Sequence, residues 1–299
     1  MARNTFRYSP PSPLNLLGFV TLTSLGILFM QTVGEPLLAR LRPRFSLFEI
    51  LVVGGFAWYM LVFWAVGLFY IRLDATRRPA FLARHKIQRR DDGEPSTLKP
   101  GRLAHTVRVV LFNQFFGTLP MLLVLYACVQ WRGMSLDDPI PSPLRVLGDL
   151  AILLACQEVL FYGFHRALHW RPLMKRFHRM HHEFKEPIGI CTHYVHWVEH
   201  MTGNLIPVFA GIVVSGCHLW VGLTWVAIVV VNAIHTHSDY HFPWMGYAVD
   251  HDWHHYHVFG NYGAMGVLDR LLGTDAALRE QDAAWRAARD RGAQASSTV

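Results

Sequence analysis

The chain alternates between long apolar runs and short polar segments. Four runs each have about the 20 residues that an α-helix needs to cross a bilayer; they are residues 14–33, 47–71, 109–131 and 144–164. A fifth run, residues 201–234, is interrupted by a Ser-Gly-Cys-His sequence and is too long for one span but short for two. We therefore expect an all-α, polytopic membrane protein with about four spanning helices and a re-entrant helical hairpin.

The polar segments in the second half of the chain hold most of the histidines. Sixteen of the 18 lie between His165 and His257, and ten of them form four clusters. The clusters are His165 and His169; His178, His181 and His182; His237 and His241; and His251, His254 and His255. Residues three or four apart on a helix share a face, so each cluster can direct two or three imidazoles at one point. Because no single ion accepts ten imidazoles, we expect two metal ions in a histidine-rich helical cap.

Other polar residues near the clusters are weaker candidates. A carboxylate beside a ligand histidine can accept a hydrogen bond from the second ring nitrogen. The carboxylates placed to do so are Glu158, Glu199, Asp239, Asp250 and Asp252, of which Glu158 and Asp252 are the stronger candidates. For any one of them alone, helix capping or a solvated charge is the favoured interpretation. The isolated histidines are interpreted as ordinary polar or core residues; they are His85, His105 and His218.

Composition and charge support a membrane protein. The 299 residues are 52% hydrophobic and 16% charged, which is too apolar for an ordinary soluble domain. The net charge of +7 comes from basic residues that flank apolar runs, so anionic lipids are the expected partner and nucleic acid is not. Residues 72–108 are strongly basic, and the positive-inside rule therefore places them, both termini and the histidines in the cytosol. Basic residues at 40, 42 and 44, in the opposite connection, count against this topology.

Three regions follow from this pattern. Residues 1–108 form a membrane anchor with two spans and a basic cytosolic linker, which includes a polar stretch at residues 91–100. Residues 109–275 form the histidine-bearing domain, and residues 276–299 form a charged cytosolic tail.

Several other metal and catalytic classes fit poorly. The chain has no His-Glu-x-x-His helix, no phosphate-binding glycine loop and no Gly-x-Ser-x-Gly turn. A catalytic zinc uses about three protein ligands and a bis-histidine haem uses fewer, so either would leave most of the clustered histidines unexplained. An all-histidine site leaves positions for dioxygen, and a site at the ends of membrane helices can receive a lipid from the bilayer.

The segments FYGFHRALH, FHRMHHEFKEPIG, YVHWVEH, HSDYHFPW and HDWHHYHVFGNYG, followed by LDRLLGTD, resemble the fatty acid hydroxylase superfamily, also called the sterol desaturase family. Within it, the nearest resemblance is to the sterol C-4 methyl oxidase branch and its fatty-acid-hydroxylase-domain-containing relatives. The resemblance covers residues 107–275. It implies a di-iron, oxygen-dependent enzyme of the endoplasmic reticulum membrane, with its active site facing the cytosol, that receives electrons from NAD(P)H through cytochrome b5 and its reductase, or a similar donor.

The resemblance also assigns ligands. The family's ligand histidines match nine of the ten clustered histidines, and His241 completes a His-x-x-x-His that fatty acid hydroxylases have and many sterol oxidases lack. His196 matches the histidine of the family's Tyr-Ala-His-Pro-x-Glu segment and is a further candidate. Two positions depart from the pattern: Asp239 replaces a glycine usual in the sterol branch, and Trp197 replaces the proline. Both departures bear on substrate choice more than on metal binding.

The leading hypothesis is therefore a membrane-bound di-iron monooxygenase that hydroxylates a hydrophobic substrate, or oxidises its methyl group, with a sterol or terpenoid as substrate. Alternatives of the same chemistry are a lipid desaturase and a tailoring hydroxylase of secondary metabolism. Alternatives of other classes are a non-catalytic membrane regulator that keeps the metal site as structure, and a zinc-dependent hydrolase that works without oxygen.

Overall fold

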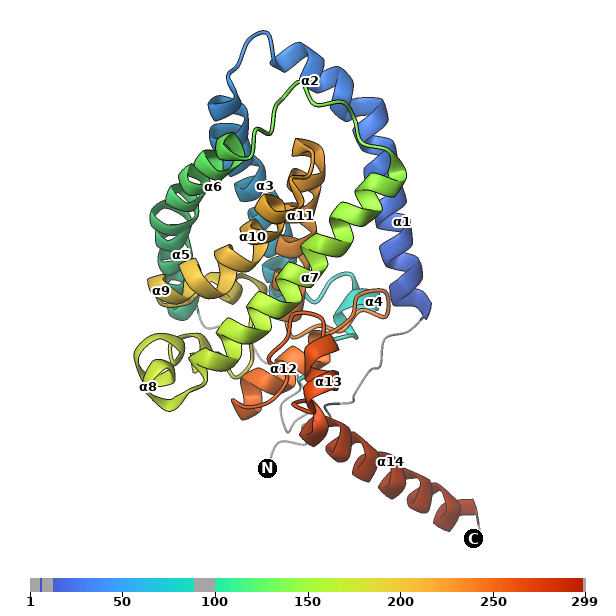
Figure 1. Cartoon of the computed structure of the whole chain (residues 1–299). Helices are drawn as coiled ribbons and strands as arrows, with labels where there is room; N and C mark the ends of the chain where they lie inside the picture. The colour runs from blue at the N-terminus through green and yellow to red at the C-terminus, as the bar shows by residue number, and fades with distance from the viewer. Residues whose placement is uncertain (1–5, 7–12, 89–99, 298–299) are drawn as a thin grey trace.

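The computed structural model describes residue 6, residues 13–88 and residues 100–297. These residues form helices joined by turns, with no strand among them, so the all-α prediction is confirmed (Figure 1). The polar stretch predicted at residues 91–100 falls almost entirely on residues 89–99, which lie outside the described residues.

Four helical segments within the described residues are long and apolar enough to cross a membrane: Glu49–Thr76, Gly101–Trp131, Trp197–Ser215 and Leu219–Thr236. The first two confirm the spans predicted at residues 47–71 and 109–131. The other two are the limbs of the predicted hairpin, which turns at Gly216 with a left-handed backbone (φ 60°). The expectation that this run is short for two spans is wrong, because helical structure starts before the apolar run and ends after it.

The other two predicted spans are helical, but neither is one of these four. Residues 13–41 are helical throughout, as α1 (Pro13–Phe29), η1 (Met30–Gly34) and α2 (Glu35–Leu41); some side chains of α1 lie outside the described set, and its crossing of the membrane stays a prediction. The predicted fourth span is α7 (Pro143–Leu168), whose buried Asp149 pairs with Arg145. The remaining two segments that are long and apolar enough to cross a membrane are the hairpin limbs.

Prolines near the start of three helices are accommodated by wide turns. The π-helical turns η1, η3 (Gln114–Thr118) and η7 (His200–Leu205) precede α2, α6 (Leu119–Trp131) and α10 (Ile206–Ser215), each of which has a proline in its first two positions. Proline lacks the N–H that an α-helix interior needs, and a π turn is one way for the chain to continue past it. The segment of α5 (Pro100–Asn113), η3 and α6 is thus one long helix.

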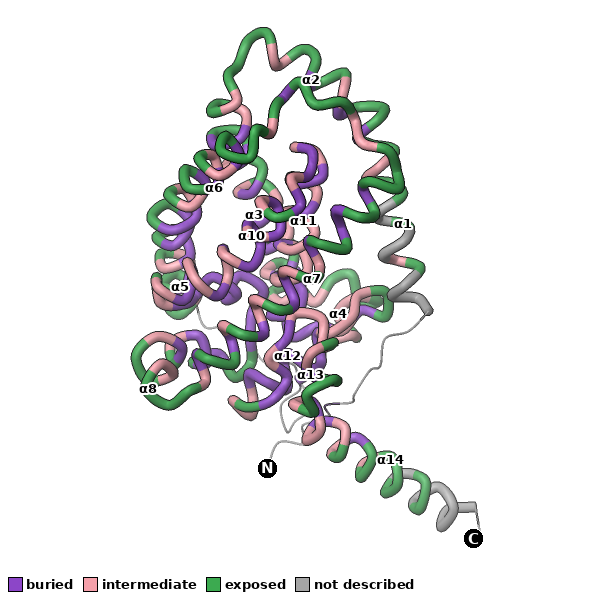
Figure 2. Tube along the Cα trace, viewed as in Figure 1, coloured by how far each residue is buried: buried purple, intermediate pink, exposed green. Residues whose placement is uncertain are grey.

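Two helix pairs organise the interior. The limb α10 packs along α7, and α11 (Leu219–Thr236) packs along α3 (Gly55–Thr76), which continues the π-helical turn η2 (Glu49–Gly54). Gly211 permits the first contact, because a Cβ there would lie 3.1 Å from the Cα of Leu153. Buried residues concentrate on these facing sides (Figure 2).

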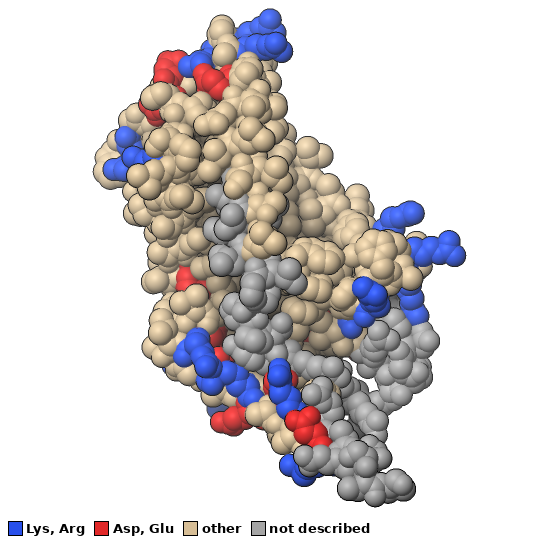
Figure 3. Space-filling view, turned by 90° about the vertical axis from the view of Figure 1, so that its right-hand side faces the viewer, with Lys and Arg blue, Asp and Glu red and all other residues tan. Residues whose placement is uncertain are grey.

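The histidine-bearing segments gather at one end of the helix bundle, opposite α2 (Figure 1). They include α12 (Ala248–His257) and the short turns η4 (Met174–His178), η5 (His181–Glu183) and η6 (Gly189–His193), and α13 (Val267–Leu272), which has no histidine, lies beside α12. The remaining short helices are α4 (Ala80–Ala83), α8 (Arg171–Leu173) and α9 (Trp197–Glu199), and α14 (Ala276–Ser297) extends away from the body. In Figure 3, charged side chains gather at the top, on the right-hand edge and toward the lower end, and the tan surface below the top has few of them.

Candidate metal centre

Nine of the ten clustered histidines form two adjacent groups. Within each group, one ligand nitrogen per residue can be chosen so that all lie within 4.8 Å of one another. The first group is His165, His169, His178, His182 and His254, and the second is His181, His237, His251 and His255. The rings of His182 and His255, which belong to different groups, are only 5.0 Å apart by their centroids. The structure thus holds two potential ion sites side by side.

The two His-x-x-His-His clusters each serve both groups. In the segment from η4 to η5, His178 and His182 are four residues apart and join the first group, while His181 joins the second. In α12 the assignment is reversed: His251 and His255 join the second group and His254 the first. Residues four apart, such as His178 and His182, share a helical face. Adjacent residues, such as His181 and His182, point in different directions. One short helical segment can therefore supply both sites.

The ends of the two longest contributing helices supply further ligands. His165 lies in the last turn of α7, and His169 caps that helix. His237 caps α11 in the same way. The last carbonyls of a helix have no partner within it, and the structure uses one of them, that of Ala233, to accept a hydrogen bond of 2.7 Å from His237 Nδ1.

Hydrogen bonds at Nδ1 orient several of the rings. A carbonyl oxygen can only accept, so each Nδ1 that bonds to one carries the proton, and its Nε2 presents a lone pair to the centre. Besides His237, the rings held in this way are His165 by Tyr262 O (2.8 Å), His254 by Gly260 O (2.6 Å) and His255 by Phe184 O (3.1 Å). His178 Nδ1 donates to the buried carboxylate of Glu199 at 2.7 Å.

The donor nitrogens fit metal ions better than they fit one another. The Nε2 atom of His178 lies 3.0 Å from that of His169 and 3.0 Å from that of His182. The Nε2 atoms of His237 and His251 lie 2.9 Å apart. Two nitrogens bound at about 2.1 Å to one ion are about 3.0–3.4 Å apart. Several of these rings carry their proton on Nδ1, on the far side of the ring. Their Nε2 atoms at this spacing therefore need a cation between them. The residues present therefore fit a pair of transition-metal ions.

Burial keeps these rings neutral. Desolvation lowers the pKa of His165 and of His237 to about 4, because a positive charge is costly in the protein interior. The Nε2 atoms of His165, His254 and His255 are buried and have no hydrogen-bond partner among the described residues. Neutral imidazoles with free lone pairs are the form that binds iron, zinc, copper and nickel.

The prediction that His241 is a ligand is not supported, because His241 belongs to neither group. Its spacing from His237 would place both on one helical face, but α11 ends at Thr236 and Asp239 adopts a left-handed backbone with φ 61°. The chain turns away, and the backbone N–H of His241 bonds to the carbonyl of His85 at 3.0 Å instead. Such a φ suits glycine, the residue that the resemblance implies for position 239; here Asp239 is buried and accepts a hydrogen bond from the Gln88 backbone N–H.

The weaker candidates have supporting positions. The Glu158 carboxylate accepts hydrogen bonds from the backbone of Ala264, Met265 and Leu268, and so caps the start of α13. The Asp252 carboxylate accepts from the side chain of Gln88. His196 caps α9 by accepting from the Val198 backbone N–H. None of the three is in either histidine group.

Sequence reasoning missed one organising residue, Asp269, although it lies in the quoted LDRLLGTD segment. Its carboxylate accepts from the backbone N–H groups of Tyr262 and Gly263, both at 2.7 Å. Gly263 has no room for a side chain, since a Cβ would lie 2.7 Å from the Asp269 carboxylate. Asp269 thereby holds the loop whose carbonyl orients His165.

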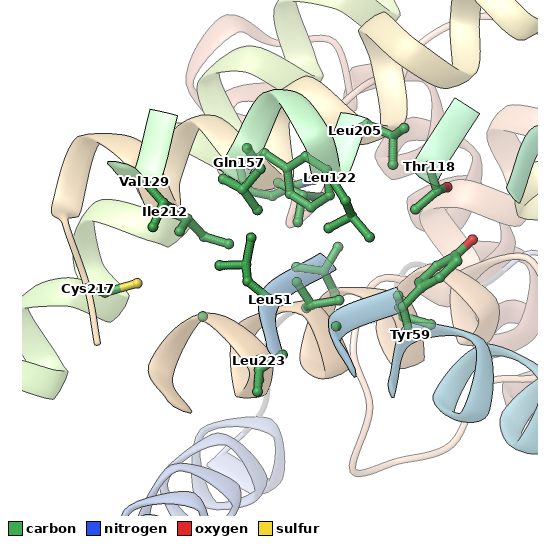
Figure 4. Close-up of a pocket in the computed structure, with 18 of the residues that line it drawn as sticks. Leu51, Tyr59, Thr118, Leu122, Val129, Gln157, Leu205, Ile212, Cys217 and Leu223 are labelled. Atoms are coloured by element: carbon green, nitrogen blue, oxygen red, sulfur yellow. The ribbon is translucent and has the colours of Figure 1, made fainter. Parts of the chain in front are cut away.

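An apolar cavity lies within the bundle beside the metal centre. It has an empty volume of about 1020 Å³, including the space at its opening, and is lined by η2, η3 and helices α3, α6, α7, α10 and α11. Cys217 lies at one end of the close-up, with Tyr59 and Thr118 at the other (Figure 4). Phe161 lines the cavity, and its ring lies 5.3 Å from that of His165 by their centroids. The cavity therefore abuts the histidines.

We expect His237→Ala to lose metal from the second group, because it removes a ligand whose lone pair is directed by Ala233. His241→Ala is the matched control and should keep the wild-type metal content. Elemental analysis of purified protein measures both. Loss of metal in His241→Ala, or full retention in His237→Ala, would contradict the grouping.

We expect Glu199→Gln to weaken metal binding by about 10- to 100-fold, the usual effect of removing a hydrogen bond that orients a ligand. An amide oxygen attracts the His178 N–H less than a carboxylate does. Competition with a chelator measures the affinity, and the exposed Glu186→Gln is the control. Equal affinities of the three proteins would show that Glu199 has no such role.

Known proteins are similar to this chain in sequence. The family model described as "Fatty acid hydroxylase" matches residues 150–274. The chain is 35% identical over 223 residues to human "Fatty acid hydroxylase domain-containing protein 2", covering 75% of this chain and 66% of that protein. It is 32% identical over 211 residues to "Fatty acid hydroxylase ahd1" of Mycosarcoma maydis, covering 70% of this chain and 54% of that protein.

Another relative is matched over most of its length. "Methylsterol monooxygenase 2-2" of Arabidopsis thaliana is 30% identical over 248 residues, covering 79% of this chain and 90% of that protein. No solved structure matches the chain. The histidine motifs, the family model and these relatives agree, and the chain belongs to the fatty acid hydroxylase superfamily.

Proposed function

We propose that this protein is a membrane-bound non-haem di-iron oxygenase that hydroxylates a sterol or terpenoid, or oxidises its methyl group. The observation that carries the proposal is the pair of all-histidine groups beside an apolar cavity, separated from it by Phe161, in a protein with candidate membrane helices. Two irons bound there would supply activation of dioxygen for attack on an unactivated C–H bond.

The number and type of ligands favour iron over zinc. A catalytic zinc typically has three protein ligands, whereas these groups offer five and four imidazoles. Both numbers fall short of the six ligands of an octahedral ion, so each group leaves room for a small molecule. No thiolate or carboxylate belongs to either group of described residues, which leaves neutral nitrogen donors to hold the ions.

The protein's own residues prepare this site. The carbonyls of Tyr262, Gly260 and Phe184 hold His165, His254 and His255 with their lone pairs inward. Such fixed ligands need no reorganisation when the reaction proceeds. The apolar walls exclude water from the space beside Phe161, where a C–H bond of the substrate would lie.

The cavity supports a hydrophobic substrate. Its described lining includes no Asp, Glu, Lys or Arg. Four of the helices around it, α3, α6, α10 and α11, belong to candidate membrane spans, so a lipid can enter it from the bilayer. The name of the plant relative, a methylsterol monooxygenase, favours a sterol or related terpenoid.

We also propose that the enzyme lies in the endoplasmic reticulum membrane with its histidine cap in the cytosol. Exposed basic residues surround the second histidine cluster; they are Lys175, Arg176 and Arg179. The positive-inside rule favours the cytosolic side for such a surface. Electrons would come there from NAD(P)H through cytochrome b5 or a similar donor protein.

The test is product formation under ¹⁸O₂. The full chain in nanodiscs, with cytochrome b5, its reductase and NADH, is expected to convert a sterol or terpenoid from a test panel to a product carrying ¹⁸O. His181→Ala/His182→Ala, which removes one ligand from each group, should abolish turnover, and His241→Ala should retain it. Turnover without oxygen would favour a hydrolase, and a folded, metal-loaded protein with no turnover on any lipid would favour a regulator.

A further inference from the structure

One polar side chain of the cavity wall, Gln157, has an atom without a hydrogen-bond partner among the described residues. Gln157 lines the cavity (Figure 4), and only 7% of its surface is exposed. Its Oε1 atom is buried without a hydrogen-bond donor among the described residues. A buried acceptor without a donor is destabilising, because it has lost its hydrogen bonds to water. A ligand that donates a hydrogen bond would remove this penalty.

Three other polar side chains of the lining already have hydrogen-bond partners within the protein. The Tyr59 hydroxyl lies 2.9 Å from His193 Nδ1, and the Thr118 hydroxyl lies 3.0 Å from His200 Nε2. The Asn204 amide donates to the Thr192 carbonyl at 3.2 Å. Among the described polar residues of the lining, Gln157 alone contributes a buried atom without a partner.

The chemistry of the lining selects the kind of ligand. An amide oxygen only accepts, so its partner must be an O–H or N–H. An ionised carboxylate or phosphate carries no such proton at neutral pH, and the described lining has no Lys or Arg to neutralise it. Burying an unpaired charge costs far more than burying a hydroxyl. The lining therefore favours an uncharged lipid alcohol over a fatty acid.

The place of Gln157 relates it to the metal centre. Gln157, Phe161 and His165 are spaced by four residues on α7, so they follow one another along the same face. Eight residues of helix correspond to about 12 Å. A group held at Gln157 thus fixes how deep a lipid lies in the cavity relative to the histidines.

We propose that Gln157 binds the hydroxyl group of an uncharged lipid alcohol through its amide oxygen and so selects and positions the substrate. This inference rests on the proposed function for the meaning of the cavity, but it concerns binding and is measurable without turnover. Gln157 is a positioning residue here, because it holds the substrate at a distance from the reacting carbon.

The experiment compares alcohols with their parent hydrocarbons. Affinities of the metal-loaded full chain are measured for tritiated 5α-cholestan-3β-ol and 5α-cholestane, for hexadecanol and hexadecane, and for palmitate. The wild type should prefer at least one alcohol to its hydrocarbon by about 10-fold, the effect of one hydrogen bond, and should bind palmitate more weakly than that alcohol. Gln157→Leu, similar in size, should reduce the preference to less than about 2-fold while it still binds the hydrocarbon.

The exposed Gln130→Leu is the matched control and should keep the wild-type preference. Metal content checks that each variant is folded. An unchanged preference in Gln157→Leu, no preference in the wild type, or palmitate binding as tight as alcohol binding would overturn the inference. Because ¹⁸O incorporation is measured separately, failure here with intact turnover leaves the proposed function standing.

Discussion

The structure depends on one constraint: the lone pairs of nine neutral imidazoles must converge in a small, buried volume. Nitrogens of the same group approach to 2.9–3.3 Å, a spacing that suits ligands of a shared cation and not free rings. Five of the nine rings are fixed by a hydrogen bond at Nδ1. The rest of the cap is arranged to meet this requirement.

Backbone carbonyls fix four of the nine rings. They come from a helix end at Ala233, from the segment after η5 at Phe184, and from the loop between α12 and α13 at Gly260 and Tyr262. That loop is in turn held by Glu158 and Asp269. Both carboxylates act through backbone N–H groups of the loop. Glu158 thus contributes to the site without touching a metal ligand. The same helix, α7, links Glu158 and His165 to Gln157 in the cavity.

Spacing in the sequence was informative wherever a helical segment continues. The pairs His165 and His169, His178 and His182, and His251 and His255 each lie in one group, as a helical face requires. His237 and His241 do not share a group, because α11 ends at Thr236 and no helix continues from His237 to His241. Division of the His-x-x-His-His clusters between two sites could not be predicted, since it depends on how distant segments pack.

The prediction of the fold from the sequence was limited for similar physical reasons. Hydropathy located the helices, but it underestimated the length of the hairpin limbs. These limbs include polar residues, such as Glu199 and His235, that are buried within the protein. It also identified α7 as a span, although this helix carries buried carboxylates within the protein. Carbonyl partners such as Tyr262 leave no trace in a sequence, because every residue has a carbonyl.

The most direct test of the account is the number and kind of metal ions per chain, measured by elemental analysis on detergent-purified protein from iron-rich growth. We expect about two irons per chain in the wild type and neither in His181→Ala/His182→Ala. A single tightly bound zinc, no metal at all, or two irons that persist in the double variant would contradict it.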